Sequence, residues 1–380
     1  MLSGILQSLS RLKITLMGNL NGRAGLKYGL PGRAELMRLK HAMPMQPQPH
    51  SIEQFGPQRN FWWHRDFLDL MATRWRLREA ASLADIGCGQ GHWARLLYGY
   101  LRAPARLIGV DREPRWVTEA AQNFCHAFPQ VAPDQFTFVE GDAAKLPLPD
   151  DSFDVVTCQT VLMHMERPRE ALREMLRVLR PGGLLVCVEP NNLWNYVAFT
   201  SLTAVEPVET VVRRFEFWLR FHRGKIAAGQ GDHTIGDLLP GYLAEAGLTE
   251  IAVHQSDRTA TIFPPYDRPE QQALLEQEQS WIRSTTGPWN REEVHRCVRD
   301  GGGSEELFER GFAELLEKFT QGQQAIRAGT FNAAGGGMTY LVSGREPGVA
   351  RRKNLTRFGR TFTPAGAPRS TLTRGPKRHR

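Results

Sequence analysis

The stretch Asp85-Ile86-Gly87-Cys88-Gly89-Gln90-Gly91 places a glycine at every second position directly behind the short apolar run Ser82-Leu83-Ala84. This order predicts a strand that runs into a tight loop. Glycine has no Cβ and tolerates positive φ, so the backbone of such a loop can approach a bound nucleoside closely. The dinucleotide-binding pattern G-x-G-x-x-G would put its third glycine at position 92, where this chain has His92. The loop alone leaves open a nicotinamide or flavin site and an ordinary strand-to-helix turn.

The segments that follow the loop alternate between apolar strands and amphipathic helices. Strands are expected at 82–87, 106–110, 136–140, 153–158, 183–189 and 249–255, and helices at 90–101, 113–127, 168–179 and 236–246. Such alternation with nearly continuous apolar strands predicts an α/β, Rossmann-like parallel sheet with helices on both faces. Ligands of such sheets bind beyond the carboxyl ends of the strands, where the glycine loop is expected to lie.

Four further motifs follow the glycine loop in order. The second strand ends in Asp111, a carboxylate that can accept hydrogen bonds from both hydroxyls of a ribose, although a helix N-cap is the alternative role. The third strand leads to Gly141-Asp142-Ala143 and then to the run Leu146–Asp154. The fourth strand ends in the loop Gln159–His164, which closes with V-L-x-H. Pro181-Gly182-Gly183 is expected to stop a helix and return the chain to the sheet.

In order and spacing, residues 60–190 resemble the class I methyltransferases that use S-adenosylmethionine, especially those that act on quinones and other small molecules. The resemblance implies a seven-stranded, mostly parallel sheet whose antiparallel last strand is best placed at 338–342. It also implies S-adenosylmethionine as the cofactor, with Asp142 on the adenine amino group. The cofactor-binding residues would be Asp85, Gly87, Cys88, Gly89, Gly91, Asp111, Arg112, Asp142, Ala143 and Gln159.

Methyl transfer from a sulfonium requires placement of the acceptor and, for a weakly acidic acceptor, a base. His164 and His233 are the candidate catalytic residues, and His222 is a third possible base. In the family that this chain resembles, the position of His164 usually shapes the floor of the pocket. His233 precedes the helix expected at 236–246, where Asp232 or Thr234 could simply cap that helix.

Residues 46–344 are predicted to form the methyltransferase domain, with its core at 60–190, 235–256 and 336–344. A helical insertion is expected between the sixth and seventh strands at 264–330, with helices near 268–284, 290–299 and 304–327. An insertion of this length at a ligand-binding edge is often a lid or a substrate pocket, and a structural or dimer-forming role is the alternative. The segment 205–223 is expected to be a helix that packs on the core with its arginines in water, and binding of an acidic aromatic substrate is the alternative.

The formal charge of +8 comes from the two ends of the chain. Residues 1–45 carry seven Lys and Arg and one acid, and residues 345–380 carry eleven Lys and Arg and one acid. Both are predicted to be flexible extensions. The rest of the chain is acidic, so a nucleic-acid-binding face is not expected there. The leading interpretation is therefore methylation of a small-molecule oxygen, carbon or nitrogen. The alternatives are an RNA or protein methyltransferase that uses the basic tails, and a non-catalytic scaffold.

The five cysteines lie far apart, without a C-x-x-C pair or a histidine cluster, which predicts buried thiols, no metal site and a reducing, cytoplasmic compartment. No segment approaches eighteen uncharged apolar residues, which predicts a soluble protein. The first twenty residues place apolar side chains at helical intervals. They could form a surface anchor or a transit peptide, or reflect an over-extended start. The acceptor is not indicated by any motif, because this fold builds acceptor pockets from its variable parts.

Overall fold

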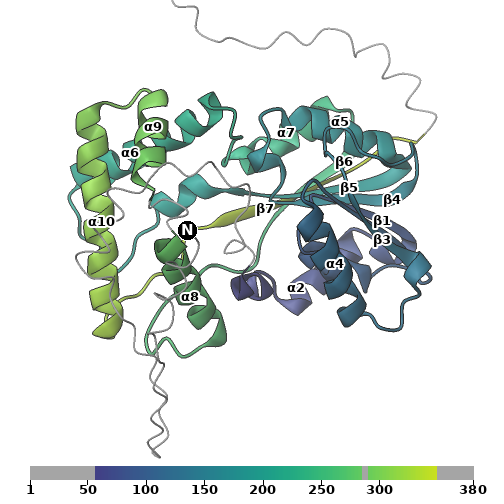
Figure 1. Cartoon of the computed structure of the whole chain (residues 1–380), viewed down its shortest axis with the longest axis horizontal. Coiled ribbons are helices and arrows are strands. Elements are labelled where there is room, and N and C mark those ends of the chain that lie inside the picture. The colour runs from purple at the N-terminus through teal and green to yellow at the C-terminus, as the bar shows by residue number, and fades with distance from the viewer. Residues whose placement is uncertain (1–55, 285–289, 349–380) are drawn as a thin grey trace, which may run out of the picture. The chain divides into compact units, whose positions relative to one another are not determined.

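The computed structural model describes residues 56–284 and 290–348 (Figure 1). The extension predicted at 1–45 and almost all of that predicted at 345–380 lie outside the described residues. Seven strands form one sheet in the order β3-β2-β1-β4-β5-β7-β6. The strands are β1 (Ser82–Ile86), β2 (Arg106–Asp111), β3 (Phe136–Glu140), β4 (Phe153–Gln159), β5 (Leu179–Asn191), β6 (Thr249–Gln255) and β7 (Met338–Arg345).

Strands β1 to β5 are parallel, and β7 lies antiparallel between β5 and β6. This arrangement confirms the predicted fold class, including the antiparallel last strand. The strand β5 begins at Leu179, earlier than predicted, and the preceding helix has already ended at Val178. Pro181-Gly182-Gly183 therefore does not stop the helix. These residues lie in an irregular start of β5, where the pairing with β4 shifts register between Phe153 and Val155.

Helices cover both faces of the sheet (Figure 1), as the alternating strand pattern predicts. On one face lie α2 (Arg65–Arg74), α3 (His92–Tyr98) and α4 (Pro114–Ala127); on the other lie α5 (Pro168–Val178) and α7 (Leu239–Glu245). Neighbouring strand residues point to opposite faces. Val155 accordingly packs with Leu97 of α3, whereas Val156 packs with Met175 of α5. Each face therefore has its own apolar core.

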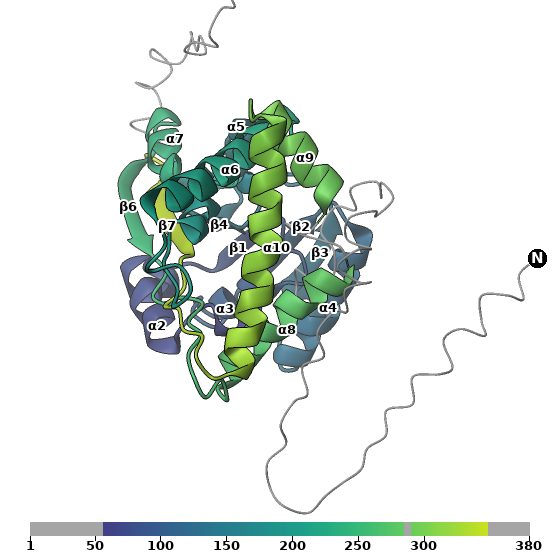
Figure 2. The same cartoon turned by 90° about the vertical axis from the view of Figure 1, so that its left-hand side faces the viewer.

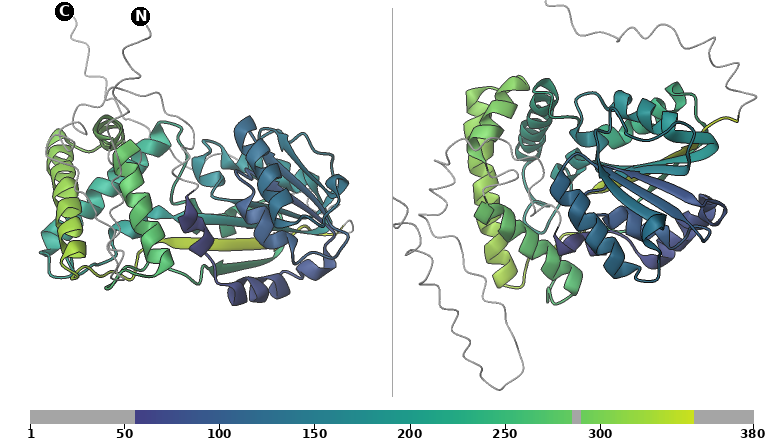
Figure 3. Two further views of the ribbon diagram at one scale, coloured as in Figure 1. Left: turned by 60° about the horizontal axis from the view of Figure 1, so that its bottom comes forward. Right: turned by 45° about the vertical axis from the view of Figure 1, so that its right-hand side comes forward.

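A third apolar core lies outside the sheet, between α6 (Val208–Ala227), α9 (Arg291–Asp300) and α10 (Glu305–Arg327), which we call the helical subdomain. Its buried side chains include Phe217, Trp218, Cys297 and Phe308. Figure 2 shows α10 alongside α6 and α9. Figure 3 shows the subdomain beyond one edge of the sheet. At this edge β7 begins, and the end of β5 pairs with the start of β7. The insertion therefore lies at the carboxyl edge of the parallel strands.

The expectation that the arginines of 205–223 face water is confirmed for Arg220 and Arg223 but wrong for Arg213 and Arg214. The guanidinium of Arg213 lies 2.6 Å from the carboxylate of Glu314 on α10, and Arg214 pairs with Glu206. Both side chains are mostly buried. The helix α6 packs against α9 and α10. The local sequence of 205–223 does not indicate these packing partners.

Four of the five cysteines are buried, but Cys125 on α4 is exposed, which corrects the expectation that all are buried.

The remaining described elements are α8 (Pro269–Ser284) and the short 3-10 helices η2 (Pro57–Phe61), η3 (Leu77–Glu79), η4 (Pro133–Gln135), η5 (Leu162–His164), η6 (Asn192–Tyr196) and η7 (Ile235–Asp237). None of the helices within residues 56–284 and 290–348 is both long and apolar enough to cross a membrane.

Replacing Gly224 by alanine is expected to destabilise the protein. A Cβ at Gly224 would lie 1.8 Å from the backbone oxygen of Cys297, so α6 and α9 would have to separate. Overpacking of this kind costs about 1–3 kcal/mol. The matched control is Gly322→Ala in α10, where a Cβ meets nothing within 4 Å. Urea unfolding should give a lower midpoint for Gly224→Ala and an unchanged or higher one for Gly322→Ala, and equal midpoints would contradict the close packing.

Candidate functional site

The glycine loop follows β1 and is attached to the end of β2. The amides of Gly87 and Cys88 donate to the carbonyl oxygen of Val110 at 2.7 and 3.0 Å. The amide of Gly89 donates to Oδ2 of Asp111 at 2.8 Å. Gly87 has φ of +67° and Gly89 of +50°, values that favour glycine. These hydrogen bonds hold the loop backbone in place. At Gly87 and Gly89 the loop carries no side chain.

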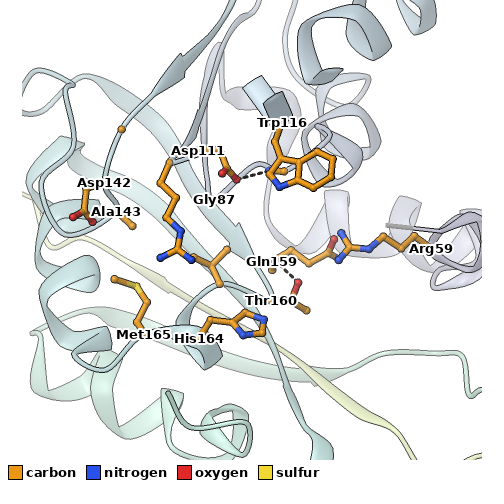
Figure 4. A pocket seen from close by; sticks show the side chains of 14 residues that line it. Arg59, Gly87, Asp111, Trp116, Asp142, Ala143, Gln159, Thr160, His164 and Met165 are labelled. Carbon is orange, nitrogen blue, oxygen red and sulfur yellow. Dashed lines mark hydrogen bonds between the residues drawn. The ribbon is translucent and has the colours of Figure 1, made fainter. Parts of the chain in front are cut away.

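A pocket of about 130 Å³ lies over this loop (Figure 4). It sits at the carboxyl ends of β1, β2 and β4, where open α/β sheets bind their ligands. Its walls come from the glycine loop, from the ends of β2, β3 and β4, from η5 and from single residues of η2 and α4. The lining residues are Arg59, Gly87, Gly89, Asp111, Arg112, Trp116, Gly141, Asp142, Ala143, Gln159, Thr160, Val161, His164 and Met165.

Most of the predicted cofactor-binding residues come together here, although they lie far apart in the sequence. Gly87, Gly89, Asp111, Arg112, Asp142, Ala143 and Gln159 line the pocket. The other predicted residues, Asp85, Cys88 and Gly91, are buried and do not line it. Asp85 and Cys88 are close enough to Asp111 for its charge to affect both groups.

Asp85 is a buried carboxyl at the end of β1. Its Oδ2 accepts a hydrogen bond from the amide of Ala94 at 3.2 Å, and its Oδ1 has no partner among the described residues. Burial raises the pKa of Asp85 to about 8, the charge of Asp111 adds to the rise, and the bond from Ala94 opposes it. A cation near this carboxyl would offset the cost of burying its charge.

The two other predicted carboxylates are both anchored by backbone amides. Oδ1 of Asp111 accepts from the amide of Glu113 at 3.0 Å, and Oδ1 of Asp142 accepts from that of Ala144 at 2.8 Å. Asp111 thus supports the start of α4 and, through Gly89, the glycine loop. Each carboxylate keeps acceptor capacity toward a ligand, because an ionised carboxylate offers about four lone-pair sites.

Two polar side chains complete the pocket opposite the carboxylates (Figure 4). Gln159 ends β4 and is only 7% exposed, and its Nε2 has no hydrogen-bond partner among the described residues. A buried amide without a partner costs about 1–3 kcal/mol, so a ligand acceptor at this position is favoured. Arg59, from η2, lines the same pocket, and burial lowers its pKa to about 10.

The structure brings the three candidate histidines into a row. His164 lines the pocket; its ring centroid lies 5.2 Å from that of His233, which in turn lies 5.8 Å from that of His222. Gly231 allows the loop that carries His233 to come close to the segment that carries His164. Its φ is +86°, and a Cβ there would lie 2.2 Å from the backbone oxygen of Met163. The loop that carries His233 therefore packs directly on η5.

His222 lies at the buried end of this row, on α6. Its side chain is only 3% exposed, and neither ring nitrogen has a hydrogen-bond partner among the described residues. Burial lowers the pKa of His222 to about 4; the nearby Lys225 lowers it further, and Asp232 opposes both effects. His222 is therefore a neutral imidazole at pH 7.

Glu189, at the carboxyl end of β5, holds η5 and thus His164 in place. Its Oε1 accepts from the amides of Val161 and Leu162, each at 2.8 Å, and its Oε2 accepts from that of Met163 at 3.3 Å. Burial raises the pKa of Glu189 to about 7 in spite of these bonds. Sequence reasoning treated this residue only as the end of a strand, although an acid that ends a buried strand is a usable signal.

Sequence reasoning also missed several lining residues. Thr160, Val161 and Met165 lie within or next to the predicted V-L-x-H loop, so the motif could have indicated them. Trp116 follows Asp111 on α4, and its indole is 1% exposed beside Asp111 (Figure 4). Arg59 carries no local signal, because it precedes the first strand and reaches the pocket only through the packing of η2.

Together, the sheet order and the carboxylate-lined pocket over a glycine loop define an α/β protein built to bind a nucleoside cofactor. Residues 84–187 match a family model described as a methyltransferase domain. The chain is 35% identical over 143 residues to the uncharacterized methyltransferase YcgJ of Bacillus subtilis, covering 38% of this chain and 53% of that protein. It is 35% identical over 126 residues to the demethylmenaquinone methyltransferase of Lactiplantibacillus plantarum, covering 33% and 52%.

The crystal structure of YcgJ from Bacillus subtilis is similar with a TM-score of 0.43 and 21% identity, covering 75% of this chain and 99% of that one. The chain spans about half the length of the curated relatives it matches. The matches to the family model and to the curated relatives agree with the motifs. Residues 84–187 therefore form a methyltransferase domain, similar to parts of YcgJ and of the demethylmenaquinone methyltransferase.

Proposed function

We propose that this protein transfers the methyl group of S-adenosylmethionine to an oxygen, nitrogen or carbon of a small organic acceptor. One observation carries the proposal: Asp111, Asp142 and Gln159 converge on the glycine loop in a single pocket at the carboxyl ends of the strands. The acidic carboxyls suit a cofactor that is positively charged at its sulfonium. When bound, the cofactor supplies an electrophilic methyl group.

The chain's own residues fit this cofactor. Asp111 would accept the ribose hydroxyls and Asp142 the adenine amino group, while the backbone of Gly87 and Gly89 would lie along the nucleoside. The amide nitrogen of Gln159, which lacks a partner among the described residues, would donate to the methionine part. Arg59 would supply a cation for the carboxylate of that part. Asp85, beneath the loop, has a pKa raised to about 8 and is mostly neutral at pH 7, and a positive charge of the bound cofactor would favour its ionised form.

His164 would accept the proton that an O–H or N–H acceptor loses on methylation. It is the one of the three candidate histidines that lines the pocket, and His233 stands behind it. A positioned general base contributes about 10²–10⁴-fold to a rate. Because Glu189 accepts hydrogen bonds from three backbone amides of this segment, it would hold His164 in place toward the acceptor.

The segments outside the sheet would select the acceptor. The helix α6 supplies His222 at the end of the histidine row, and α8 packs against η2, which carries Arg59. Beside His222, the ring of Tyr196 stacks on Trp218 with centroids 4.0 Å apart. These neutral and aromatic groups favour a small apolar or aromatic acceptor. One curated relative is by its name a demethylmenaquinone methyltransferase, which fits a small-molecule acceptor.

Calorimetric titration with S-adenosylhomocysteine tests the cofactor site. The full chain should bind it, and Asp111→Asn should weaken binding about tenfold or more, because a hydrogen bond to a charged group contributes about 1.5–3 kcal/mol. The control Asp134→Asn changes an exposed carboxylate in η4, outside the pocket, and should have no effect. Absence of binding, or equal affinities for all three proteins, would refute the proposed site.

The acceptor class can be tested separately. The protein is incubated with methyl-labelled S-adenosylmethionine and cell extract divided into small-molecule, RNA and protein fractions. We expect the label in the small-molecule fraction, and mass spectrometry then identifies the product. Label found in RNA or protein alone would overturn the proposed acceptor class while leaving the cofactor site intact.

A further inference from the structure

The cofactor pocket takes one wall from a single segment of the chain. Residues 159–165, from the end of β4 through η5, supply Gln159, Thr160, Val161, His164 and Met165 to its lining (Figure 4). We call this segment the pocket turn. In the proposed reaction Gln159 would contact the cofactor, and His164 would face the acceptor. What fixes the backbone of the pocket turn therefore bears on both halves of the reaction.

The pocket turn contains a strained residue near its start. Thr160 has a φ of +54°, in the left-handed region that a β-branched residue rarely adopts. Its amide donates to the carbonyl oxygen of Val188 at 2.8 Å, and its hydroxyl donates to that of Gln159 at 2.7 Å. Strain of this kind persists only where the surrounding structure fixes the backbone by further contacts. The pocket turn therefore depends on an anchor outside itself.

Glu189 of β5 is that anchor. Its carboxylate accepts hydrogen bonds from the three backbone amides that follow Thr160, and Sγ of Cys158 donates to its Oε1 at 3.8 Å. The side chain of Glu189 is fully buried. Hydrogen bonds to an ionised acceptor are roughly twice as strong as those between neutral groups. An ionised Glu189 therefore holds the pocket turn more strongly than a protonated one does.

The pocket turn also contacts the glycine loop. A Cβ at Gly87 would lie 2.4 Å from Cγ2 of Val161, so the side chain of Val161 lies directly against the backbone of Gly87. The amide of Val161 is one of the three that Glu189 binds. A shift of the pocket turn would therefore move Val161 relative to the loop, as well as moving His164. Through this backbone, Glu189 is connected to the cofactor side of the pocket and to the acceptor side.

Glu189 can gain or lose a proton near neutral pH. Burial raises the pKa of Glu189 from its ordinary value of 4.5 to about 7, although the bonds from the three amides and from Cys158 oppose the rise. The ionisable groups on the surrounding elements are Asp85 of β1, Cys158 of β4, His164 of η5, Asp237 of η7 and Tyr340 of β7. Burial raises the pKa of Asp85, and a hydrogen bond with Cys187 raises that of Cys158, so neither adds much negative charge at pH 7. The strength of the anchor therefore changes around pH 7.

We propose that Glu189 is a positioning residue of the methyl-transfer site, whose carboxylate sets Val161 against the glycine loop and His164 against the acceptor through the backbone of the pocket turn. Glu189 does not line the pocket, so it acts without touching the cofactor or the acceptor. The part that concerns His164 rests on the proposed methyl transfer, whereas the part that concerns Val161 requires cofactor binding alone. Because the ionised form is the stronger anchor, cofactor affinity and turnover should both rise as the pH passes upward through 7.

The binding test is calorimetric titration of the full chain with S-adenosylhomocysteine from about pH 6 to about pH 8, the interval in which a group with a pKa near 7 ionises. The affinity of the unaltered protein should rise about fivefold across this interval. Glu189→Gln resembles the protonated form and should remove most of this rise. Ionisation of Asp85 affects both proteins, so the difference between the two curves measures the contribution of Glu189. The control Glu306→Gln changes an exposed glutamate at the start of α10 and should keep the full rise.

Unfolding by urea separates a positioning role from a purely structural one. A buried acid whose pKa is raised by folding stabilises the protein most while it is protonated, and this stabilisation is lost as the pH rises from 4.5 through about 7. The urea midpoint of the unaltered protein, measured relative to that of Glu189→Gln, should therefore fall over the interval in which affinity for S-adenosylhomocysteine rises. A purely structural role predicts that affinity falls together with stability.

Turnover tests the part that concerns His164. With the acceptor identified by methyl labelling, Glu189→Gln should lower kcat about tenfold at about pH 8 and less than about threefold at about pH 6, where the unaltered protein is itself mostly protonated at Glu189. Ionisation of His164 persists in both proteins and cancels in this comparison. Glu189→Asp keeps the charge, so its kcat should again depend on pH in the way that Glu189→Gln does not.

Two results would overturn the proposal. One is the same pH dependence of S-adenosylhomocysteine affinity in the unaltered protein and Glu189→Gln, and the other is affinity that falls together with the urea midpoint. If Glu189→Gln does not fold, Glu189→Asp decides, because its side chain is too short to reach all three amides; affinity equal to that of the unaltered protein at every pH would then exclude a positioning role.

Failure of the proposed function gives a different result. If the unaltered protein binds no S-adenosylhomocysteine at any pH, the cofactor site is refuted, and the role of Glu189 with it. If it binds S-adenosylhomocysteine with the expected pH dependence but methylates no fraction of the extract, the methyl transfer is refuted, and the effect of Glu189 on cofactor binding stands.

Discussion

Gly87→Ala is expected to weaken the binding of S-adenosylhomocysteine by about a hundredfold. A Cβ at this position would lie 2.4 Å from Cγ2 and 2.8 Å from Cγ1 of Val161. Overpacking costs about 1–3 kcal/mol, and the left-handed conformation adds about 1–2 kcal/mol for a residue with a Cβ. Both costs apply in the loop that forms the floor of the pocket. Calorimetric titration measures the effect directly.

Two further variants test the cause of this effect. In Gly87→Ala/Val161→Ala the two clashing carbons are removed, so part of the affinity should return, although the strain of a φ of +67° remains. Gly99→Ala is the matched control, because a Cβ there meets nothing within 4 Å and φ is −64°. If Gly87→Ala binds S-adenosylhomocysteine as tightly as Gly99→Ala does, the loop does not form the cofactor site.

His164→Gln is expected to lower kcat by about a hundredfold or more, because loss of a positioned base costs about 10²–10⁴ in rate. Affinity for S-adenosylhomocysteine should change by no more than about threefold, since glutamine keeps the size and polarity of the side chain. The rate of S-adenosylhomocysteine formation with the acceptor found by methyl labelling measures kcat. A loss of rate without a loss of affinity would show that His164 acts in proton removal and not in cofactor binding.

The other histidines provide the comparison. His233→Gln should lower kcat less, by about tenfold, because His233 stands behind His164 and does not line the pocket. His126→Gln replaces an exposed histidine at the end of α4 and should leave the rate unchanged. Full activity of His164→Gln would show that His164 is not the base, and full activity of both His164→Gln and His233→Gln would favour a reaction driven by placement of the acceptor.

The strands and the cofactor pocket were predictable because their signals are local. An apolar run followed by glycine or aspartate marks the end of a buried parallel strand, and parallel strands in one sheet end at the same edge. Asp111, Asp142 and Gln159 therefore had to lie near the glycine loop once the strand order was recognised. Five motifs that match in order along the sequence identified this strand order, whereas a single motif could not.

The packing partners of α6 could not be predicted from its own residues. Its pattern of aromatics and arginines is equally suited to a helix on the sheet and to one that packs against other helices. The structure places it on α9 and α10, where Glu314 pairs with Arg213. The two residues are 101 positions apart, and no spacing rule links them. The same reason explains why Arg59 and Glu189 were missed as parts of the site.

The chain's local patterns determined the sheet, the glycine loop and the cofactor class, because each depends on hydrophobic periodicity and on residues within a few positions of a strand end. Only the tertiary structure showed the row of His164, His233 and His222 and the anchoring of η5 by Glu189. These features join groups from separate elements. Their distances, burial and electric field exist only after the elements pack together.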